Sequence, residues 1–190
     1  IVFDFDRTLT NGQSSPGTTE LGRLVRGGQR TIDALSDAVQ AGVRLYIITA
    51  RRPARLTVEQ LYASLDHAQK ALSPFFPRGT EIEELQFRGL PLARGGCIYA
   101  AGYEKAAALA HIVSNAQQER SRVVFFDDSI PNAYDVALSL HLQEGDAGRL
   151  LEELRVLWWD SFEEEAGPSP TMGLSSPTSS DWNYHEHYHR

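Results

Sequence analysis

Residues 1–10 constrain the fold of this chain more than any other stretch. A short apolar run leads directly into two carboxylates, Asp4 and Asp6, and two threonines, Thr8 and Thr10, follow. An apolar run of this kind is typical of a strand in a parallel sheet, which is covered on both faces. Ligands of open α/β sheets bind at the carboxyl ends of such strands, where Asp4 and Asp6 are expected.

The two carboxylates have two interpretations. Carboxylates this close repel each other, and a cation or a shared proton between them would stabilise the pair. A solvated strand end followed by a threonine-capped turn explains the same residues. The first ten residues alone do not decide between the two.

Three later stretches favour the functional interpretation. Residues 43–49 form an apolar run that ends in Thr49, and residues 123–126 form another that ends in Asp127 and Asp128. Between them, Lys105 begins an alanine-rich helical segment and is one of only two lysines in the chain. Two adjacent carboxylates after a buried strand are costly without a cation, which indicates a metal site.

In chain order these residues read D-x-D-x-T, T, K and D-D, which resembles the four motifs of the haloacid dehalogenase (HAD) superfamily of phosphatases and phosphotransferases. The resemblance extends from residue 1 to about residue 141. It implies an α/β fold, a HAD-like Rossmannoid three-layer α/β/α sandwich around a mostly parallel central sheet of about five strands. It also implies a Mg²⁺-dependent phosphatase that forms an aspartyl-phosphate on Asp4.

The resemblance assigns a role to each motif residue. Asp4 is the nucleophile, and Asp6 is the general acid and base. The expected Mg²⁺ ligands are Asp4, the backbone carbonyl of Asp6, and Asp128, with Asp127 supporting the site from the next shell. The expected phosphate-binding residues are Thr49, its neighbour Ala50, and Lys105.

Several of these residues have ordinary structural explanations. Thr49 could make a local backbone bond at a strand end. A lysine in the first turn opposes the helix dipole, so an anion held near Lys105 would explain its position, whereas the alternative is a lysine that reaches solvent. Arg23, Arg26 and Arg30 could contact an anionic substrate, but surface arginines are the favoured interpretation. Arg51 is a candidate phosphate contact, because guanidinium groups bind phosphate with two bonds.

The chain departs from the family pattern at Arg7, where a glycine or another small residue is common. We expect this change to alter loop contacts more than mechanism. Residues 51–102 leave room for at most a minimal substrate-covering cap. By analogy with the family, a small cap accompanies macromolecular or bulky substrates.

Three other classes of protein are alternatives to a phosphatase. A catalytically silent HAD-fold binding protein is the main one, and the presence of Asp4, Asp6, Lys105 and Asp128 argues against it. In a response-regulator receiver the acidic pair comes first and the lysine last, so the motif order here opposes that class. A Rossmann dinucleotide-binding protein is opposed by the lack of G-x-G-x-x-G after a strand.

Composition limits the partners. The net charge of −7 argues against binding to nucleic acid or a membrane surface, and no run is long enough to span a membrane. The resemblance to the HAD superfamily implies a phosphorylated small molecule or a phosphoprotein as substrate, and we expect a cytoplasmic location. The single cysteine, Cys97, excludes an internal disulfide. The sequence does not indicate an oligomeric state.

Hydrophobic periodicity and turn residues also predict the elements and domains. The predicted domains are a catalytic domain over residues 1–162 and a disordered tail over 163–190 with a histidine-rich end. A loop is predicted over residues 88–96. Strands are predicted at the N-terminus and over residues 43–49, 81–87, 97–100, 123–126 and 138–142. Helices are predicted over residues 31–41, 57–72, 103–118 and 148–157, and from Pro131.

Overall fold

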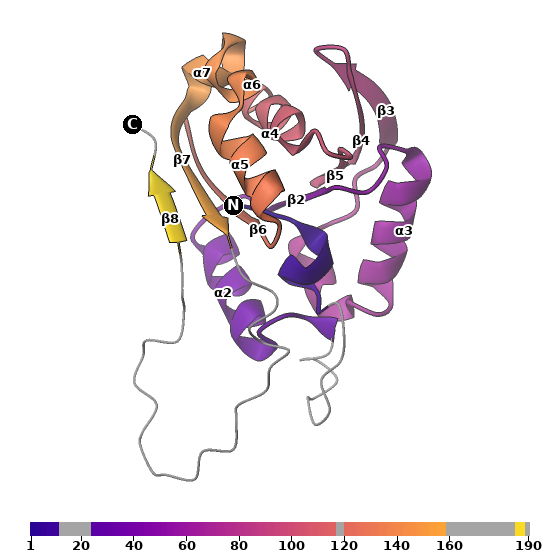
Figure 1. The fold of residues 1–190 in the computed structure, drawn as a ribbon. Coiled ribbons are helices and arrows are strands. Elements are labelled where there is room, and N and C mark those ends of the chain that lie inside the picture. Colours follow the sequence, from indigo (N-terminus) through magenta and orange to yellow (C-terminus); the bar gives the residue numbers. More distant parts are fainter. Residues whose placement is uncertain (12–23, 117–119, 159–184, 189–190) are drawn as a thin grey trace, which may run out of the picture.

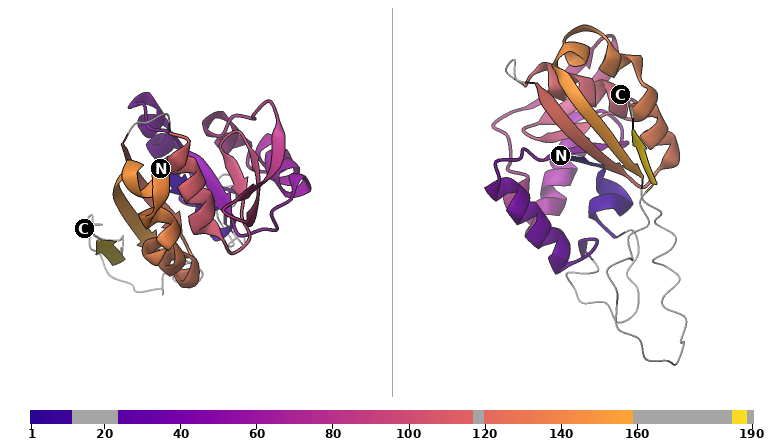
Figure 2. Two further views of the ribbon diagram at one scale, coloured as in Figure 1. Left: turned by 90° about the horizontal axis from the view of Figure 1, so that it is seen from above. Right: turned by 90° about the vertical axis from the view of Figure 1, so that its left-hand side faces the viewer.

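An eight-stranded mixed sheet forms the centre of the protein (Figures 1 and 2). The computed structural model describes residues 1–11, 24–116, 120–158 and 185–188. The strand order is β3-β4-β5-β2-β1-β6-β7-β8. The strands are β1 (Val2–Phe3), β2 (Tyr46–Thr49), β3 (Ile82–Phe87), β4 (Leu90–Gly95), β5 (Ile98–Ala100), β6 (Ser121–Asp127), β7 (Leu151–Trp158) and β8 (His185–Tyr188).

Five neighbouring strands, β5, β2, β1, β6 and β7, are parallel. The β3–β4 hairpin extends the sheet antiparallel beyond β5, and β8 pairs antiparallel with β7. The predicted α/β class with a mostly parallel sheet is therefore confirmed. No helix of the described residues is long and apolar enough to cross a membrane.

Helices cover both faces of the sheet (Figure 1). Alternation along the strands explains the two layers, because Ile47 and Ile48 are both fully buried but belong to different hydrophobic clusters. The Ile47 face packs on α2 (Gln29–Gln40), α3 (Arg55–Asp66) and the 3₁₀ helix η2 (Lys70–Phe75). The Ile48 face packs on α4 (Lys105–Ser114), α5 (Ile130–Leu138), α6 (Leu140–Gln143) and α7 (Gly145–Leu150).

The connections place a topological switch point between β1 and β6. From β1 the chain passes to β2, then through the β3–β4 hairpin at the edge of the sheet to β5 beside β2. It then crosses to β6 on the other side of β1 and continues to β7. The two central strands pair in parallel, and the Asp4 N–H donates to the Phe126 carbonyl at 2.8 Å. Ligands of such sheets bind in the crevice at the carboxyl ends of the two strands that flank the switch point.

The prediction of a loop over residues 88–96 is wrong, because β4 lies there. Arg88 and Gly89 both have positive φ, as a two-residue hairpin turn requires, and Phe87 pairs with Leu90. Pro91 suggested a loop, but it pairs only with β3, since pairing of β4 with β5 begins at Ala93. A proline is tolerated where a strand has a neighbour on one side only.

The predicted strand over residues 138–142 and the predicted helix over 148–157 are also wrong. The first stretch is the junction of α5 and α6, where Leu138 and Leu140 are exposed and only Leu142 is buried. The second contains β7, which pairs with β6 along its whole length. Leucines spaced three or four apart suggested a helix, but strand pairing at the open side of β6 determines the structure.

The boundary predicted at residue 162 stays a prediction. Residues 163–184 and 189–190 of the expected tail lie outside the described residues. Within the expected histidine-rich end, residues 185–188 form β8 beside β7.

Candidate metal and phosphate site

A buried lysine joins two carboxylates at the switch point. The Lys105 Nζ donates to Asp4 Oδ1 at 2.5 Å and to Asp127 Oδ2 at 2.6 Å. The lysine side chain is 1% exposed, and the two carboxylates are 6% and 0% exposed. Asp4 follows β1, Asp127 ends β6, and Lys105 is the first residue of α4, so three distant segments build this contact. The alternative of a lysine that reaches solvent does not fit this burial.

Asp128 completes the cluster. Carboxylate oxygens of Asp4, Asp127 and Asp128 all lie within 4.8 Å of one another. Two hydrogen bonds fix the backbone of Asp128. The Asp128 N–H donates to the Thr8 hydroxyl at 3.1 Å, and the Asp128 carbonyl accepts from the Trp158 indole at 3.2 Å. Thr8 therefore connects the loop after β1 to the loop after β6.

Asp127 uses both of its oxygens within the protein. Oδ2 accepts from Lys105, while Oδ1 accepts from the Ser129 N–H at 2.8 Å and the Asn132 side chain at 3.3 Å. Asp4 and Asp128 are thus better placed to bind a cation, with Asp127 orienting Asp4 through Lys105 and holding the loop of Asp128 through the Ser129 N–H. Ser129 and Asn132 have no predicted role, although polar residues in the turn and first helical turn after Asp128 are a usable signal.

The electrostatics of the cluster favour an additional positive charge. Burial raises the pKa of Asp4 from 3.8 to about 7, because lost hydration and the nearby acids outweigh the attraction of Lys105. Burial and the charge of Asp127 also raise the pKa of Asp128. Three carboxylates face one ammonium group, so the fully ionised cluster has an excess of negative charge that a divalent cation would neutralise.

The donor set fits Mg²⁺. The ion prefers oxygen ligands at about 2.1 Å, which places pairs of ligand oxygens roughly 3 to 4 Å apart, and it retains several water ligands. Carboxylate oxygens within 4.8 Å of one another can reach this geometry with small side-chain movements. Oxygen donors alone do not distinguish Mg²⁺ from other hard cations.

The segment between Asp4 and Thr10 is a wide turn, η1 (Phe5–Leu9), closed by the Thr10 N–H donating to the Phe5 carbonyl at 3.1 Å. Arg7 lies in this turn with φ of 62°, a left-handed conformation that glycine adopts most easily. The Arg26 guanidinium donates to the Arg7 carbonyl. Arg26 is 5% exposed, so its prediction as a surface residue is wrong. The glycines that follow Arg26 in the sequence do not indicate that its side chain is buried beneath the turn.

Asp6 lies beside the cluster but outside it. Both of its oxygens accept from Arg51, Oδ2 from Nε at 2.9 Å and Oδ1 from Nη2 at 2.7 Å. The two side chains are about half exposed, at 49% for Asp6 and 39% for Arg51. This hydrogen-bonded pairing raises the pKa of the Arg51 guanidinium. The expected acid and base residue is therefore present at the site but bound to an arginine.

Thr49 and Ala50 lie at the end of β2, next to β1. Phe3 pairs with Ile47, so Thr49 lies two residues further along the neighbouring strand. Thr49 is fully buried, and its hydroxyl oxygen accepts from the Arg51 N–H at 3.2 Å. This is the local bond that the structural explanation predicts, and because it uses only a lone pair of the oxygen it does not prevent the hydroxyl from donating to a phosphate.

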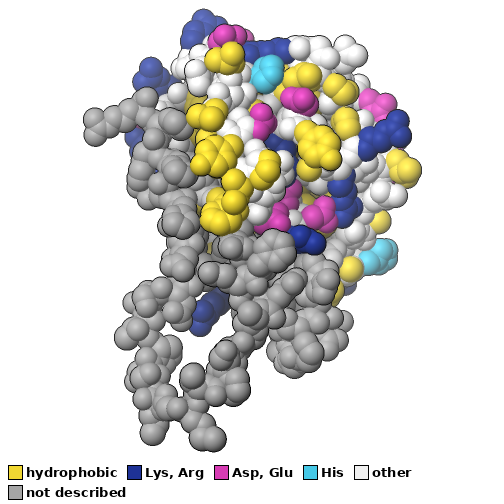
Figure 3. All heavy atoms as spheres, in the orientation of Figure 1, with side chains coloured by type: hydrophobic (Ala, Val, Ile, Leu, Met, Phe, Trp, Pro, Cys, Tyr) yellow, Lys and Arg dark blue, Asp and Glu magenta, His cyan; other side chains and the backbone are white. Residues whose placement is uncertain are grey.

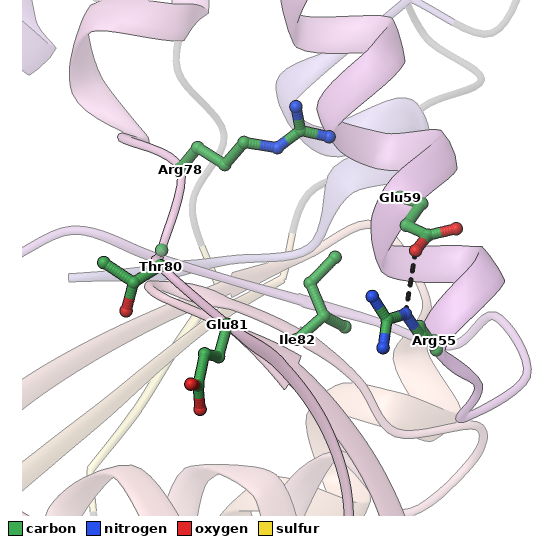
Figure 4. Close-up of a pocket in the computed structure, with 7 residues that line it drawn as sticks. Arg55, Glu59, Arg78, Thr80, Glu81 and Ile82 are labelled. Atoms are coloured by element: carbon green, nitrogen blue, oxygen red, sulfur yellow. Dashed lines mark hydrogen bonds and ion pairs between the residues drawn. The ribbon is translucent and has the colours of Figure 1, made fainter.

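The face that Figure 3 shows combines acidic, basic and apolar side chains near its centre. A separate cavity of about 720 Å³ lies between the start of α3 and the segment before β3 (Figure 4). Its charged lining is balanced, with Arg55 paired to Glu59 at 2.9 Å and both Arg78 and Glu81 nearby. None of the clustered carboxylates lines this cavity, so its size does not make it the candidate site.

Comparisons with known proteins do not assign a family. No family model matches the chain, no curated protein matches it, and no solved structure matches it. The candidate function therefore depends on the geometry of the clustered carboxylates and on Lys105.

Proposed function

We propose that this protein is a Mg²⁺-dependent phosphatase of the HAD type that hydrolyses a phosphate monoester through an aspartyl-phosphate on Asp4. The substrate would be a phosphorylated small molecule or a phosphoprotein. The resemblance of the motif order to the HAD superfamily supports the proposal, as does a helix-covered, mostly parallel sheet.

The observation that carries the proposal is the buried Lys105 between Asp4 and Asp127 at the switch point. Burying an ion pair costs several kcal/mol per ion before the attraction is counted, so stability alone explains it poorly. A nucleophilic carboxylate and the oxygens of a phosphoryl group both need such a fixed positive charge. Asp128 adds a cation-binding oxygen at the same place.

The residues divide the reaction into two displacements. The Asp4 carboxylate attacks phosphorus, forming a bond from its oxygen while the ester bond to the leaving oxygen breaks, and Asp6 gives that oxygen a proton. Water then attacks the phosphorus of the aspartyl-phosphate, Asp6 takes the proton from water, and inorganic phosphate leaves Asp4. Lys105 holds Asp4 in place, and with Thr49 it can donate to phosphoryl oxygens.

Asp4 and Asp128 would hold Mg²⁺, which supplies positive charge against the nucleophile and the phosphoryl oxygens. Asp127 contributes by fixing Lys105 and the loop of Asp128.

The test is hydrolysis of para-nitrophenyl phosphate with Mg²⁺ and with EDTA, by the wild type, Asp4→Asn and Asp37→Asn. Asp37 is an exposed residue of α2 and serves as the matched control. We expect Mg²⁺-dependent turnover that Asp4→Asn lowers by about 10³-fold or more, as for loss of a nucleophile, and that Asp37→Asn leaves unchanged. Equal turnover by folded Asp4→Asn would refute the mechanism.

Absence of turnover by a folded wild type that still binds Mg²⁺ would favour the second possibility, a catalytically silent binding protein. The pairing of Asp6 with Arg51 is the one observation compatible with that alternative, since it occupies the expected acid.

A further inference from the structure

Arg51 forms an ion pair with two hydrogen bonds beside the candidate site. It joins the loop after β2 to the turn after β1, and two hydrogen bonds of 2.7 and 2.9 Å occupy both oxygens of Asp6. A planar guanidinium fits a carboxylate and a phosphate equally well in this two-bond arrangement. The contact is thus of a kind that a phosphate could replace.

The backbone around Arg51 is fixed at the same strand end as Thr49. Its N–H donates to the Thr49 hydroxyl oxygen, and its carbonyl accepts from the Gly102 N–H at 2.9 Å. The guanidinium carbon lies 5.6 Å from the centre of the Phe5 ring. Only the outer part of the side chain needs to move for Arg51 to change partner, since these contacts fix its backbone.

Arg51 also lies near the nucleophile, because the Asp6 that it contacts is two residues from Asp4 in the turn after β1. The charge of Asp4, in addition to the bonds with Asp6, raises the pKa of Arg51. A phosphoryl group bound against Asp4 and Lys105 would bring two negative charges toward the guanidinium, in place of the single charge of Asp6. Because the ion pair is about half exposed, water weakens it, and phosphate can compete for Arg51.

The pairing conflicts with the role of Asp6. A general acid needs an oxygen that can face the leaving group, but in this structure both oxygens of Asp6 face Arg51. The conflict is resolved if Arg51 exchanges Asp6 for the phosphate of the substrate. The arriving phosphate then frees Asp6, the acid that the reaction needs.

We propose that Arg51 is a positioning residue that holds Asp6 away from the carboxylate cluster in the substrate-free protein and releases it by transferring its two hydrogen bonds to the bound phosphate. This inference depends on the proposed phosphatase function. It adds a condition for catalysis. Asp6 becomes available as the acid only when the bound group accepts two hydrogen bonds from Arg51, as a phosphate can.

The test measures the dissociation constant of inorganic phosphate with Mg²⁺ present, by calorimetry, for the wild type, Arg51→Gln, Asp6→Asn and the double variant. Arg51→Gln should weaken phosphate binding by about tenfold or more, as for loss of two charged hydrogen bonds. Asp6→Asn should tighten binding severalfold, since Arg51 no longer has a competing partner. This gain should disappear when Arg51 is already Gln.

The double variant separates exchange from general electrostatics. Removal of the Asp6 charge near an anion would tighten binding to the same extent with or without Arg51, and that result would overturn the proposal. No gain in Asp6→Asn would overturn it as well. Arg51→Lys keeps the positive charge but loses the planar guanidinium that makes two parallel hydrogen bonds. It should therefore bind phosphate more tightly than Arg51→Gln but less tightly than the wild type.

Arg94→Gln is the matched control. Arg94 pairs with Glu83 at 2.9 Å, with exposures of 34% and 45% that resemble those of Arg51 and Asp6, but the pair lies on the β3–β4 hairpin. It should leave phosphate affinity unchanged. Wild-type turnover of para-nitrophenyl phosphate reports separately on the proposed function: turnover combined with unchanged phosphate affinity in Arg51→Gln would reject this inference alone.

Discussion

Two regions of the protein contain similar charged residues but differ in burial. One is the carboxyl edge of β1 and β6, and the other is the β3–β4 hairpin. Each has an arginine at positive φ, Arg7 in one and Arg88 in the other, and each has an arginine paired with an acid. At the hairpin the charges are partly hydrated, whereas at the switch point Lys105 and Asp127 are almost fully buried.

The two regions differ in the cost of removing a charge. Partly exposed ion pairs contribute about 0–1 kcal/mol and can be lost at little cost. Buried ionic groups lose hydration, and removing one partner leaves the other uncompensated. A buried cluster at a switch point is therefore a better indicator of function than the more numerous surface pairs, and four predictions test this contrast.

The largest expected effect is that of Lys105→Met. The substitution keeps the approximate volume of the side chain but leaves Asp4 and Asp127 without their shared cation, so we expect a loss of about 3–5 kcal/mol in unfolding free energy and loss of activity. Arg94→Met at the hairpin should cost about 1 kcal/mol or less. Urea denaturation measures both, and similar losses would remove the contrast between the two regions.

Binding of Mg²⁺ should stabilise the switch-point edge. Saturation at about 100 times the dissociation constant contributes about 2.7 kcal/mol, which corresponds to a rise in Tm of roughly 5–10 °C for a domain of this size. Thermal unfolding with Mg²⁺ and with EDTA measures the shift. Asp128→Asn should abolish it and Asp37→Asn should not, so a shift that persists in Asp128→Asn would place the cation elsewhere.

The metal-free protein should lose stability as pH rises. Burial raises the pKa of Asp4 from 3.8 to about 7, so the native state binds more protons than the unfolded state between these values. The contribution of Asp4 to the free energy of unfolding is fully present below about pH 4 and is lost as pH rises through about 7. Urea midpoints in EDTA at about pH 5 and about pH 8 should differ less in Asp4→Asn than in the wild type; an unchanged difference would mean that Asp4 is not the responsible group.

The smallest effect concerns backbone strain in the turn after β1. Arg7 has φ of 62°, so Arg7→Gly should raise unfolding free energy by about 0.5–1 kcal/mol. Arg88→Gly is the comparison, because Arg88 has φ of 53° but also donates to the carbonyls of His141 and Glu144. We expect no gain there. A loss of stability in Arg7→Gly would show that contacts of the Arg7 side chain outweigh the strain.

Sequence reasoning was most successful where residues must meet at a sheet edge. The motifs predicted that Asp4, Lys105, Asp127 and Asp128 would come together, because the carboxyl ends of parallel strands share one edge. The partners of these residues were less visible. The sequence makes Arg51 a candidate phosphate contact, but its bond to Asp6 depends on the loop conformations after β1 and β2, which the sequence does not indicate.

The fold was least predictable at the ends of the sheet. Pro91 suggested a loop in place of β4, and leucine spacing suggested a helix in place of β7. Pairing with neighbouring strands, rather than local propensity, determines both. The buried position of Arg26 could not be predicted either, since nothing in the local sequence shows that a turn lies above it.

The most direct test of the central claim is to trap the covalent intermediate. Wild-type protein would be mixed with para-nitrophenyl phosphate and Mg²⁺, quenched in acid within the first turnover, digested, and analysed by mass spectrometry. We expect one phosphoryl group on the peptide that contains Asp4, absent when Mg²⁺ is chelated and absent in Asp4→Asn. Steady turnover with the phosphoryl group on another residue would contradict the account.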